Sequence, residues 1–277
     1  MKEIDIKSIS TKNLYQILTS AITPRPIALV STIDNNGTSN LSPYSFFNVF
    51  SINPPILIFS PVNRVRDNTK KDTLHNINDI KECVVGLVSE NIAQQISLAS
   101  SNFLPHEDEF KKAGFSKLES KYVKPFLIKE SPINFECKVN SVIKLGEEGG
   151  SGNLVVCEII NIHINEEVLD KDDQIDPFKL KIVSRLGGDW YGKTTAKSLY
   201  QISKPISKIG IGIDNLPEEI KHSKILSGND LAILASIEDI PSKKNNTSSD
   251  LNTEEKHILA KQLLEEGKAK EAWQKLI

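Results

Sequence analysis

Cations and hydroxyls gathered between residues 63 and 73 form the part of the sequence best suited to holding an anion. Phosphate binds main-chain N–H groups, hydroxyls and fixed cations. This loop precedes a predicted helix over 73–80, which Asp72 is placed to cap and whose N-terminus attracts negative charge. Taken alone, the residues favour a solvated basic loop over a phosphate site. The polar side chains are Arg64, Arg66, Asn68, Thr69, Lys70, Lys71 and Thr73.

A second group of polar and aromatic residues lies in the stretch 24–48, PRPIALVSTIDNNGTSNLSPYSFFN. The apolar run 27–30 leads into Ser31 and Thr32, and residues 35–37 predict a hairpin turn because Asn and Gly tolerate positive φ. Hydroxyls and amides at strand ends can bind a ring edge that presents both donors and acceptors, or they can cap turns. The second strand is expected to end in Ser45, Phe46, Phe47 and Asn48.

Bulk properties exclude several classes of function. The 277 residues are 39% hydrophobic and 25% charged, which is typical of a globular protein. A net charge of −2 provides no general basic field for nucleic acid. The first ten residues, MKEIDIKSIS, lack the apolar core of a secretory signal, and no apolar run is long enough to span a bilayer. We therefore expect a cytoplasmic protein that binds neither nucleic acid nor membrane.

Cysteine and histidine spacing does not predict a metal centre. The three cysteines, Cys83, Cys137 and Cys157, are odd in number, lack C-x-x-C spacing and stand in apolar strand-like runs. They are therefore interpreted as buried, inert thiols. The five histidines show no paired ligand spacing. The sequence also lacks a Gly-x-Ser-x-Gly elbow and a Walker-type phosphate loop.

Many short strands separated by turns predict a closed antiparallel barrel with inserted helices. A short helix or a turn is expected over 13–21, and a helix after Ser89 with Ile92, Ala93, Ile96 and Ala99 on one face. A short helix is expected to end at Gly114. The expected strands cover about 26–33, 38–45, 56–60, 83–88, 132–144, 153–165 and 178–185.

The chain changes character after about residue 195. Residues 196–241 are interpreted as an extension that packs on the barrel, and the polar run 242–253 as a linker. A final helix over 254–277, capped by Thr253 and broken at Gly267, completes the predicted organisation. The glycines of GIGID at 210–214 are not a dinucleotide fingerprint, because the third glycine is missing.

Several sequence blocks occur together in one order: PRPIALVST, NLSPYSFFN, PPILIFSP, Lys71-Asp72-Thr73, ECK at 136–138 and RLGGDWY at 185–191. This pattern resembles the flavin-reductase-like family of FMN-binding split barrels, flavoredoxins included. The resemblance covers roughly residues 20–195. It implies a mainly β fold with inserted helices: an FMN-binding split β-barrel over 1–195 plus a C-terminal extension ending in a helix.

The resemblance also implies which residues contact FMN. It favours the phosphate for Arg64, Lys71, Asp72 and Thr73, and the isoalloxazine edge for Ser31, Thr32, Ser45 and Asn48. Phe46 and Phe47 are expected to flank the ring, although neighbouring strand residues face opposite ways and at least one should pack in the core. No catalytic side chain and no metal ligand are predicted.

Two further features keep alternatives open. The family carries the 185–191 block near either the flavin or a dimer interface. His163 is compatible with a place near the nicotinamide, but an ordinary half-exposed strand histidine is the simpler interpretation.

The resemblance implies an FMN-dependent oxidoreductase that transfers hydride from NAD(P)H to flavin. Electrons would pass to a partner protein, oxygen or free flavin, and a homodimer is implied. One alternative is a non-enzymatic FMN-binding electron carrier or sensor. Another is a ligand-free interaction protein that uses the barrel as a scaffold.

Overall fold

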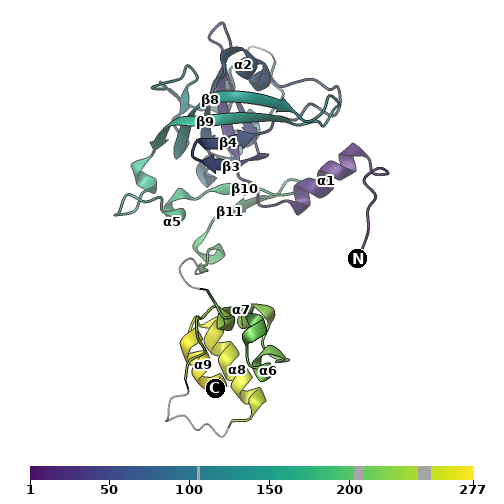
Figure 1. Ribbon diagram of the computed structural model, residues 1–277. Helices are drawn as coiled ribbons and strands as arrows, with labels where there is room; N and C mark the ends of the chain where they lie inside the picture. Colours follow the sequence, from purple (N-terminus) through teal and green to yellow (C-terminus); the bar gives the residue numbers. More distant parts are fainter. Residues whose placement is uncertain (105–106, 203–208, 243–250) are drawn as a thin grey trace. The chain divides into compact units, whose positions relative to one another are not determined.

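The chain forms two compact units, residues 1–199 and residues 200–277. The computed structural model describes residues 1–104, 107–202, 209–242 and 251–277 (Figure 1). No helix in these ranges is long and apolar enough to cross a membrane.

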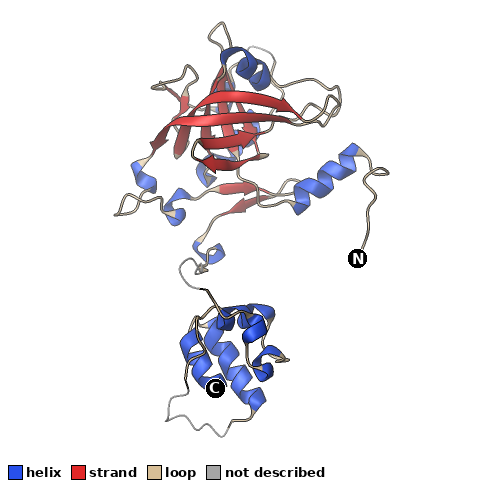
Figure 2. Ribbon diagram, viewed as in Figure 1, coloured by secondary structure: helices blue, strands red, loops and turns tan. Residues whose placement is uncertain are grey.

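The first unit is built on a seven-stranded antiparallel sheet that curls into a barrel (Figure 2). The strand order is β2-β1-β5-β8-β9-β4-β3, so β2 and β3 lie at opposite ends although they follow one another in the chain. The strands are β1 (Ala28–Ile33), β2 (Ser39–Tyr44), β3 (Phe47–Ile52), β4 (Pro55–Phe59), β5 (Glu82–Leu87), β8 (Ile133–Lys144) and β9 (Asn153–Ile164). Two short hairpins pair β6 (Lys117–Leu118) with β7 (Leu127–Ile128), and β10 (Val183–Arg185) with β11 (Tyr191–Lys193).

Alternation along β1 sends its side chains into two separate apolar clusters. Leu29 packs with the helices α3 (Ala93–Ala99) and α4 (Glu109–Ala113), while Ala28 and Val30 face a cluster around Phe59 and α2 (Asp72–Ile80). The three cysteines lie in the second cluster as buried free thiols, with 3.8 Å between the Sγ atoms of Cys83 and Cys157. The expected mainly β fold and buried thiols are therefore confirmed.

The largest error in the predicted strands concerns residues 45–52. The predicted strand over 38–45 matches β2, but β3 was not predicted as a separate strand: the chain bends at Ser45 and Phe46, and β3 starts at Phe47. Pairing of Phe47 with Phe59 of β4 fixes this register. Apolar side chains at 49, 50 and 52 are exposed, so no alternation of buried and exposed positions marks β3 in the sequence.

Smaller differences occur at helix ends. The expected strand over 178–185 is shortened, because the Asp176 carboxylate accepts from two main-chain N–H groups and starts α5 (Pro177–Leu180). Asp72 is the first residue of α2 and does not cap it. The expected helix over 13–21 is α1 (Thr11–Ala21), which Ser10 caps, and Gly114 ends α4 in the left-handed conformation as predicted.

The second unit is helical and has its own core. Its helices are α6 (Glu218–Lys221), α7 (Gly228–Ala235), α8 (Thr253–Glu265) and α9 (Ala269–Leu276). Trp273 is 1% exposed, and its indole N–H donates to the Leu234 carbonyl at 3.1 Å. Leu216, Ala260 and Leu264 belong to the same cluster.

This shared core corrects the expected division of the C-terminal region. We predicted 196–241 and 254–277 as separate segments, but helices on both sides of 242–253 bury one set of side chains. Most of the predicted linker, 243–250, lies outside the described residues. Asn252, and not Thr253, caps α8, because its side chain accepts from the Glu255 N–H at 2.9 Å. The predicted packing of 196–241 on the barrel stays a prediction.

Candidate functional site

An apolar cavity of about 510 Å³ opens at the bend between β2 and β3. The bend brings four of the predicted residues, 45 to 48, into its lining. Phe47 also packs against the core cluster around Phe59, while Phe46 is partly exposed, as expected for neighbours that face opposite ways. Leu18 of α1 and Ile22, the residue directly after α1, also line the cavity. We refer to this space as the apolar cavity.

The glycine-rich turn between β8 and β9 brings the basic loop against this cavity. Asn63 donates its main-chain N–H to the Ser151 carbonyl at 2.9 Å, and Gly150 donates to the Asn63 carbonyl at 3.0 Å. A Cβ atom at Gly149 would lie 3.0 Å from the Val65 carbonyl oxygen, so glycine permits the close approach. The turn thereby fixes the loop that carries Arg64.

A second, polar hollow lies further along β2. Its lining includes Ser42, Arg64, Lys71, Thr73, Ser101 and Asn102, and we call it the cation hollow. Ser42 stands three residues before Ser45 of the apolar cavity, which is roughly 10 Å of extended chain. The strand β2 and the bend after it therefore connect the apolar cavity with the cation hollow.

Hydrogen bonds and ring contacts from described residues, and no ion pair among them, surround the cations of this hollow. Lys71 Nζ lies 3.5 Å from Ser42 Oγ and 5.3 Å from the centre of the Tyr44 ring. Arg64 donates to the Thr69 hydroxyl at 2.9 Å and to the Lys70 carbonyl at 3.1 Å. Burial, and then the neighbouring Arg64, lowers the pKa of Lys71. Within the described residues, no carboxylate approaches either cation to ion-pair distance.

Two predicted ligands, Thr73 and Thr32, use their hydroxyls inside the protein. Thr73 donates to the Asn40 side-chain oxygen at 2.6 Å, so its main-chain N–H is the donor left for a phosphate. Thr32 accepts from Asn76 at 3.1 Å. Thr32 and Ser31 are fully buried and line neither the apolar cavity nor the cation hollow. The structure therefore corrects the prediction that Ser31 and Thr32 bind the flavin ring.

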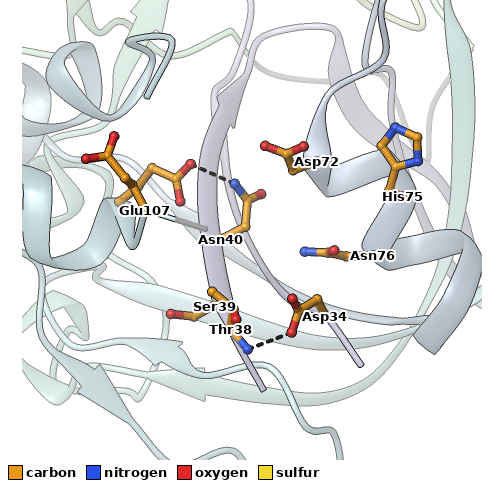
Figure 3. Close-up of a pocket in the computed structure, with 9 residues that line it drawn as sticks. Asp34, Thr38, Ser39, Asn40, Asp72, His75, Asn76 and Glu107 are labelled. Atoms are coloured by element: carbon orange, nitrogen blue, oxygen red, sulfur yellow. Dashed lines mark hydrogen bonds between the residues drawn. The ribbon is translucent and has the colours of Figure 1, made fainter. Parts of the chain in front are cut away.

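An acidic hollow of about 200 Å³ lies next to Asn40. In Figure 3, Asp72 and His75 lie on one side of it, and Asn40 and Glu107 on the other. Asn40 donates to Glu109 at 2.8 Å, and burial raises the pKa of that carboxyl. Asp72 and Glu109 each line both this hollow and the cation hollow. Because the Asp72 carboxylate repels a phosphate, we restrict the predicted cofactor role of Asp72 to the main-chain N–H at the start of α2.

Arg25, which the sequence did not single out, occupies the wall of the apolar cavity. Its guanidinium donates to the carbonyls of Ile22 at 2.7 Å and Leu186 at 3.2 Å, and to the Ser45 hydroxyl at 3.4 Å. It also lies 6.0 Å from the centre of the Phe46 ring. A buried arginine between two prolines carries no distinctive sequence signal, which is why only the fold shows its position.

Residues 185–191 help to form the cavity, because they hold α1 beside it. Arg25 and Arg185 exchange main-chain hydrogen bonds of 3.1 and 2.9 Å. A Cβ atom at Gly187 would come within 2.8 Å of Ser20 Cα, so only glycine allows α1 to approach the β10–β11 hairpin this closely. This contact associates the block with the cavity.

His163 belongs to a hydrogen-bonded cluster and does not line the apolar cavity. Its Nε2 lies 2.6 Å from the Glu136 carboxylate, which is fully buried and also accepts from Asn161 at 3.0 Å. The same carboxylate accepts from three consecutive main-chain N–H groups, of residues 121 to 123. The interpretation of His163 as an ordinary strand histidine therefore fits the structure.

We expect Glu136→Gln to reduce stability near neutral pH. Burial alone would raise the pKa of Glu136, but hydrogen bonds from His163, Asn161 and the main chain lower it to about 2, against an ordinary 4.5. The difference in pKa corresponds to roughly 3 kcal/mol in the free energy of unfolding. This stabilisation is present above pH 4.5 and is lost as the pH falls toward 2. Chemical denaturation at several pH values measures this. A variant equally destabilised at pH 7 and at the lowest accessible pH would contradict the assignment.

The two hollows together suit a ligand with a flat ring and an anionic end. Tyr44 is buried beneath Lys71, and burial raises the pKa of its hydroxyl to about 12, so the hydroxyl stays protonated. Lys71 and Arg64 supply positive charge and form no ion pair with the carboxylates of the described residues. Ser45, Asn48 and an apolar wall supply the chemistry for a ring. FMN has both parts, and the residues present fit it.

Comparison with known proteins agrees with this geometry. Residues 20–178 match the model of the flavin reductase like domain. This chain belongs to the flavin reductase-like family. It is 37% identical over 191 residues to an uncharacterised Aquifex aeolicus protein, covering 69% of this chain and 95% of the relative. Bacillus subtilis YwrF, also uncharacterised, is 35% identical over 188 residues, covering 67% and 91%. Each of these two matches thus leaves about a third of this chain uncovered.

Solved structures support the fold and its chemistry. Nitrilotriacetate monooxygenase component B from Bacillus cereus matches with a TM-score of 0.68 and 30% identity, covering 73% of this chain and 98% of that one. The 2-nitrobenzoate 2-nitroreductase NbaA of Pseudomonas fluorescens matches at 0.67 and 28%, covering 76% and 100%. A Shewanella frigidimarina protein described as having a split barrel domain matches at 0.62 and 20%, covering 74% and 100%. The fold is therefore the predicted split barrel, and a flavin-associated oxidoreductase function is supported.

Proposed function

We propose that this protein is an FMN-dependent oxidoreductase that uses NAD(P)H as hydride donor and passes the electrons to a partner protein, oxygen or free flavin. The observation that carries the proposal is the pairing of the apolar cavity with the cation hollow along β2. The family supports a flavin cofactor in general. FMN is favoured because the cation hollow would hold one phosphate.

The chain's own residues would bind and orient the cofactor. Lys71 and Arg64 would neutralise the phosphate, and Ser45 and Asn48 would hydrogen-bond the ring edge. Phe46 and its apolar neighbours would exclude water. The flavin itself supplies the redox chemistry when bound, which explains why no general acid is required of the protein. A nicotinamide would enter through the open side of the apolar cavity.

We also propose a homodimer. β3 is an edge strand of the sheet, and its Val49, Phe50 and Ile52 are 56%, 64% and 82% exposed. An exposed apolar edge strand is normally covered, here by a second copy of this chain. Light scattering of the purified protein tests this: a monomer at micromolar concentration would overturn it. The cytoplasmic location expected from the sequence stays a prediction.

Anaerobic mixing of the FMN-loaded protein with NADH, and separately with NADPH, tests the oxidoreductase proposal. Loss of the visible flavin absorbance within seconds would support it and would identify the nucleotide. An FMN-loaded protein whose absorbance persists with both nucleotides would overturn it in favour of a non-enzymatic carrier or sensor.

A further inference from the structure

Among the described residues that line the apolar cavity, Arg25 is the one that carries a charge. The residue is 8% exposed, and in the described part of the chain no carboxylate lies within ion-pair distance of its guanidinium. A buried charge without a counterion is costly unless another group compensates for it. The cavity therefore holds a fixed positive charge where a ring would bind.

Main-chain carbonyls orient this charge but do not neutralise it. Both hydrogens of Nη1 are directed to the carbonyls of Thr19 and Ile22, at the C-terminal end of α1. Nη2 donates to the Leu186 carbonyl, and its second hydrogen has no acceptor in the described residues. Arg185 donates to the same carbonyl at 3.4 Å, which places a second cation nearby. Two arginines on one carbonyl oxygen leave a local excess of positive charge.

If Arg25 served only to hold α1 in place, its contacts with the carbonyls would be explained. Its unpaired N–H and its position in the cavity wall would not. Ser45, which we place at the ring edge, is a direct neighbour of Arg25 Nε at 3.4 Å. Charge beside the ring nitrogens of a flavin alters the ring's affinity for electrons. A hydride carries two electrons and one proton, so a neutral ring that receives it gains one negative charge.

We propose that Arg25 stabilises the negative charge that the flavin ring gains on reduction, so that the protein binds reduced FMN more tightly than oxidised FMN. This inference rests on the proposed function. It assigns Arg25 a role distinct from that of Lys71, since the charge on the phosphate is the same in both redox states. Removing Lys71 should weaken both forms equally, whereas removing Arg25 should weaken the reduced form more.

The test compares the dissociation constants of oxidised and dithionite-reduced FMN for the wild type, Arg25→Gln, Arg25→Lys and the control Lys71→Gln. We expect Arg25→Gln to reduce the preference for reduced FMN about tenfold, which corresponds to a midpoint potential about 30 mV more negative. Arg25→Lys should keep most of the preference. Lys71→Gln should leave the ratio of the two constants unchanged.

Two results would overturn the inference, and a third would overturn the proposed function on which it rests. If Arg25→Gln weakens the binding of oxidised and reduced FMN equally, Arg25 serves only to hold α1 in place. A wild type that binds oxidised FMN more tightly than reduced FMN would overturn the inference without any variant, so the test survives a variant that does not fold. A wild type that binds neither form would instead overturn the proposed function.

Discussion

Replacing Lys71 by alanine is expected to weaken FMN binding by about 2–3 kcal/mol, roughly 30- to 150-fold. The ammonium group lies in the cation hollow beside Ser42, with no carboxylate within ion-pair distance in the described residues. A charge-assisted contact with a phosphate dianion would therefore be lost without replacement. Quenching of flavin fluorescence on titration measures the change.

Riboflavin separates this effect from general damage to the site. Riboflavin has the same ring but no phosphate, so it should bind more weakly than FMN. Its affinity for the wild type and for Lys71→Ala should be the same. The matched control is Arg66→Ala, which removes a cation of the same loop whose side chain is 79% exposed and pairs with Asp67. Equal losses for FMN and riboflavin in Lys71→Ala, or a comparable loss in Arg66→Ala, would contradict the phosphate assignment.

Trp273→Ala is expected to unfold the C-terminal unit while FMN binding by the barrel persists. Truncating a buried tryptophan costs about 3–5 kcal/mol. The unit is only 78 residues long (277 − 199), and a single core of that size rarely supplies more than about 3–5 kcal/mol of stability. Calorimetry of the wild type should show two transitions, and the variant should lose one of them.

Trp190→Ala is the matched control, because that indole is 75% exposed and belongs to the first unit. It should leave the transition of the C-terminal unit in place. Truncation after Leu199 should give a folded protein that still takes up FMN, whereas truncation at Ser242 should expose Leu234 and its neighbours. A single transition for the wild type, or loss of FMN binding in Trp273→Ala, would show that the units depend on each other.

Local signals in the sequence were sufficient for much of the barrel. The Asn-Gly turn, the apolar strand runs and Gly114 as a helix end all depend on neighbouring residues, and the structure confirms them. Arg64 and Lys71 line the same hollow, as their closeness in sequence suggested, while their binding of a phosphate stays a prediction.

Contacts between distant residues could not be predicted in this way. Arg25 acquires its place from carbonyls on α1 and at Leu186, which is 161 residues away. The β1 register turns Thr32 toward Asn76 of α2, which removed it from the predicted ring site. The C-terminal core joins Leu234 to Trp273 across a polar run that the sequence presents as a boundary.

The most direct test of the central claim is the visible absorption spectrum of the protein after incubation with FMN and removal of unbound ligand. We predict a yellow protein that retains about one FMN per chain, and that retains much less riboflavin under the same conditions. A folded protein that stays colourless after incubation with FMN would contradict the assignment of the apolar cavity and the cation hollow as one FMN site.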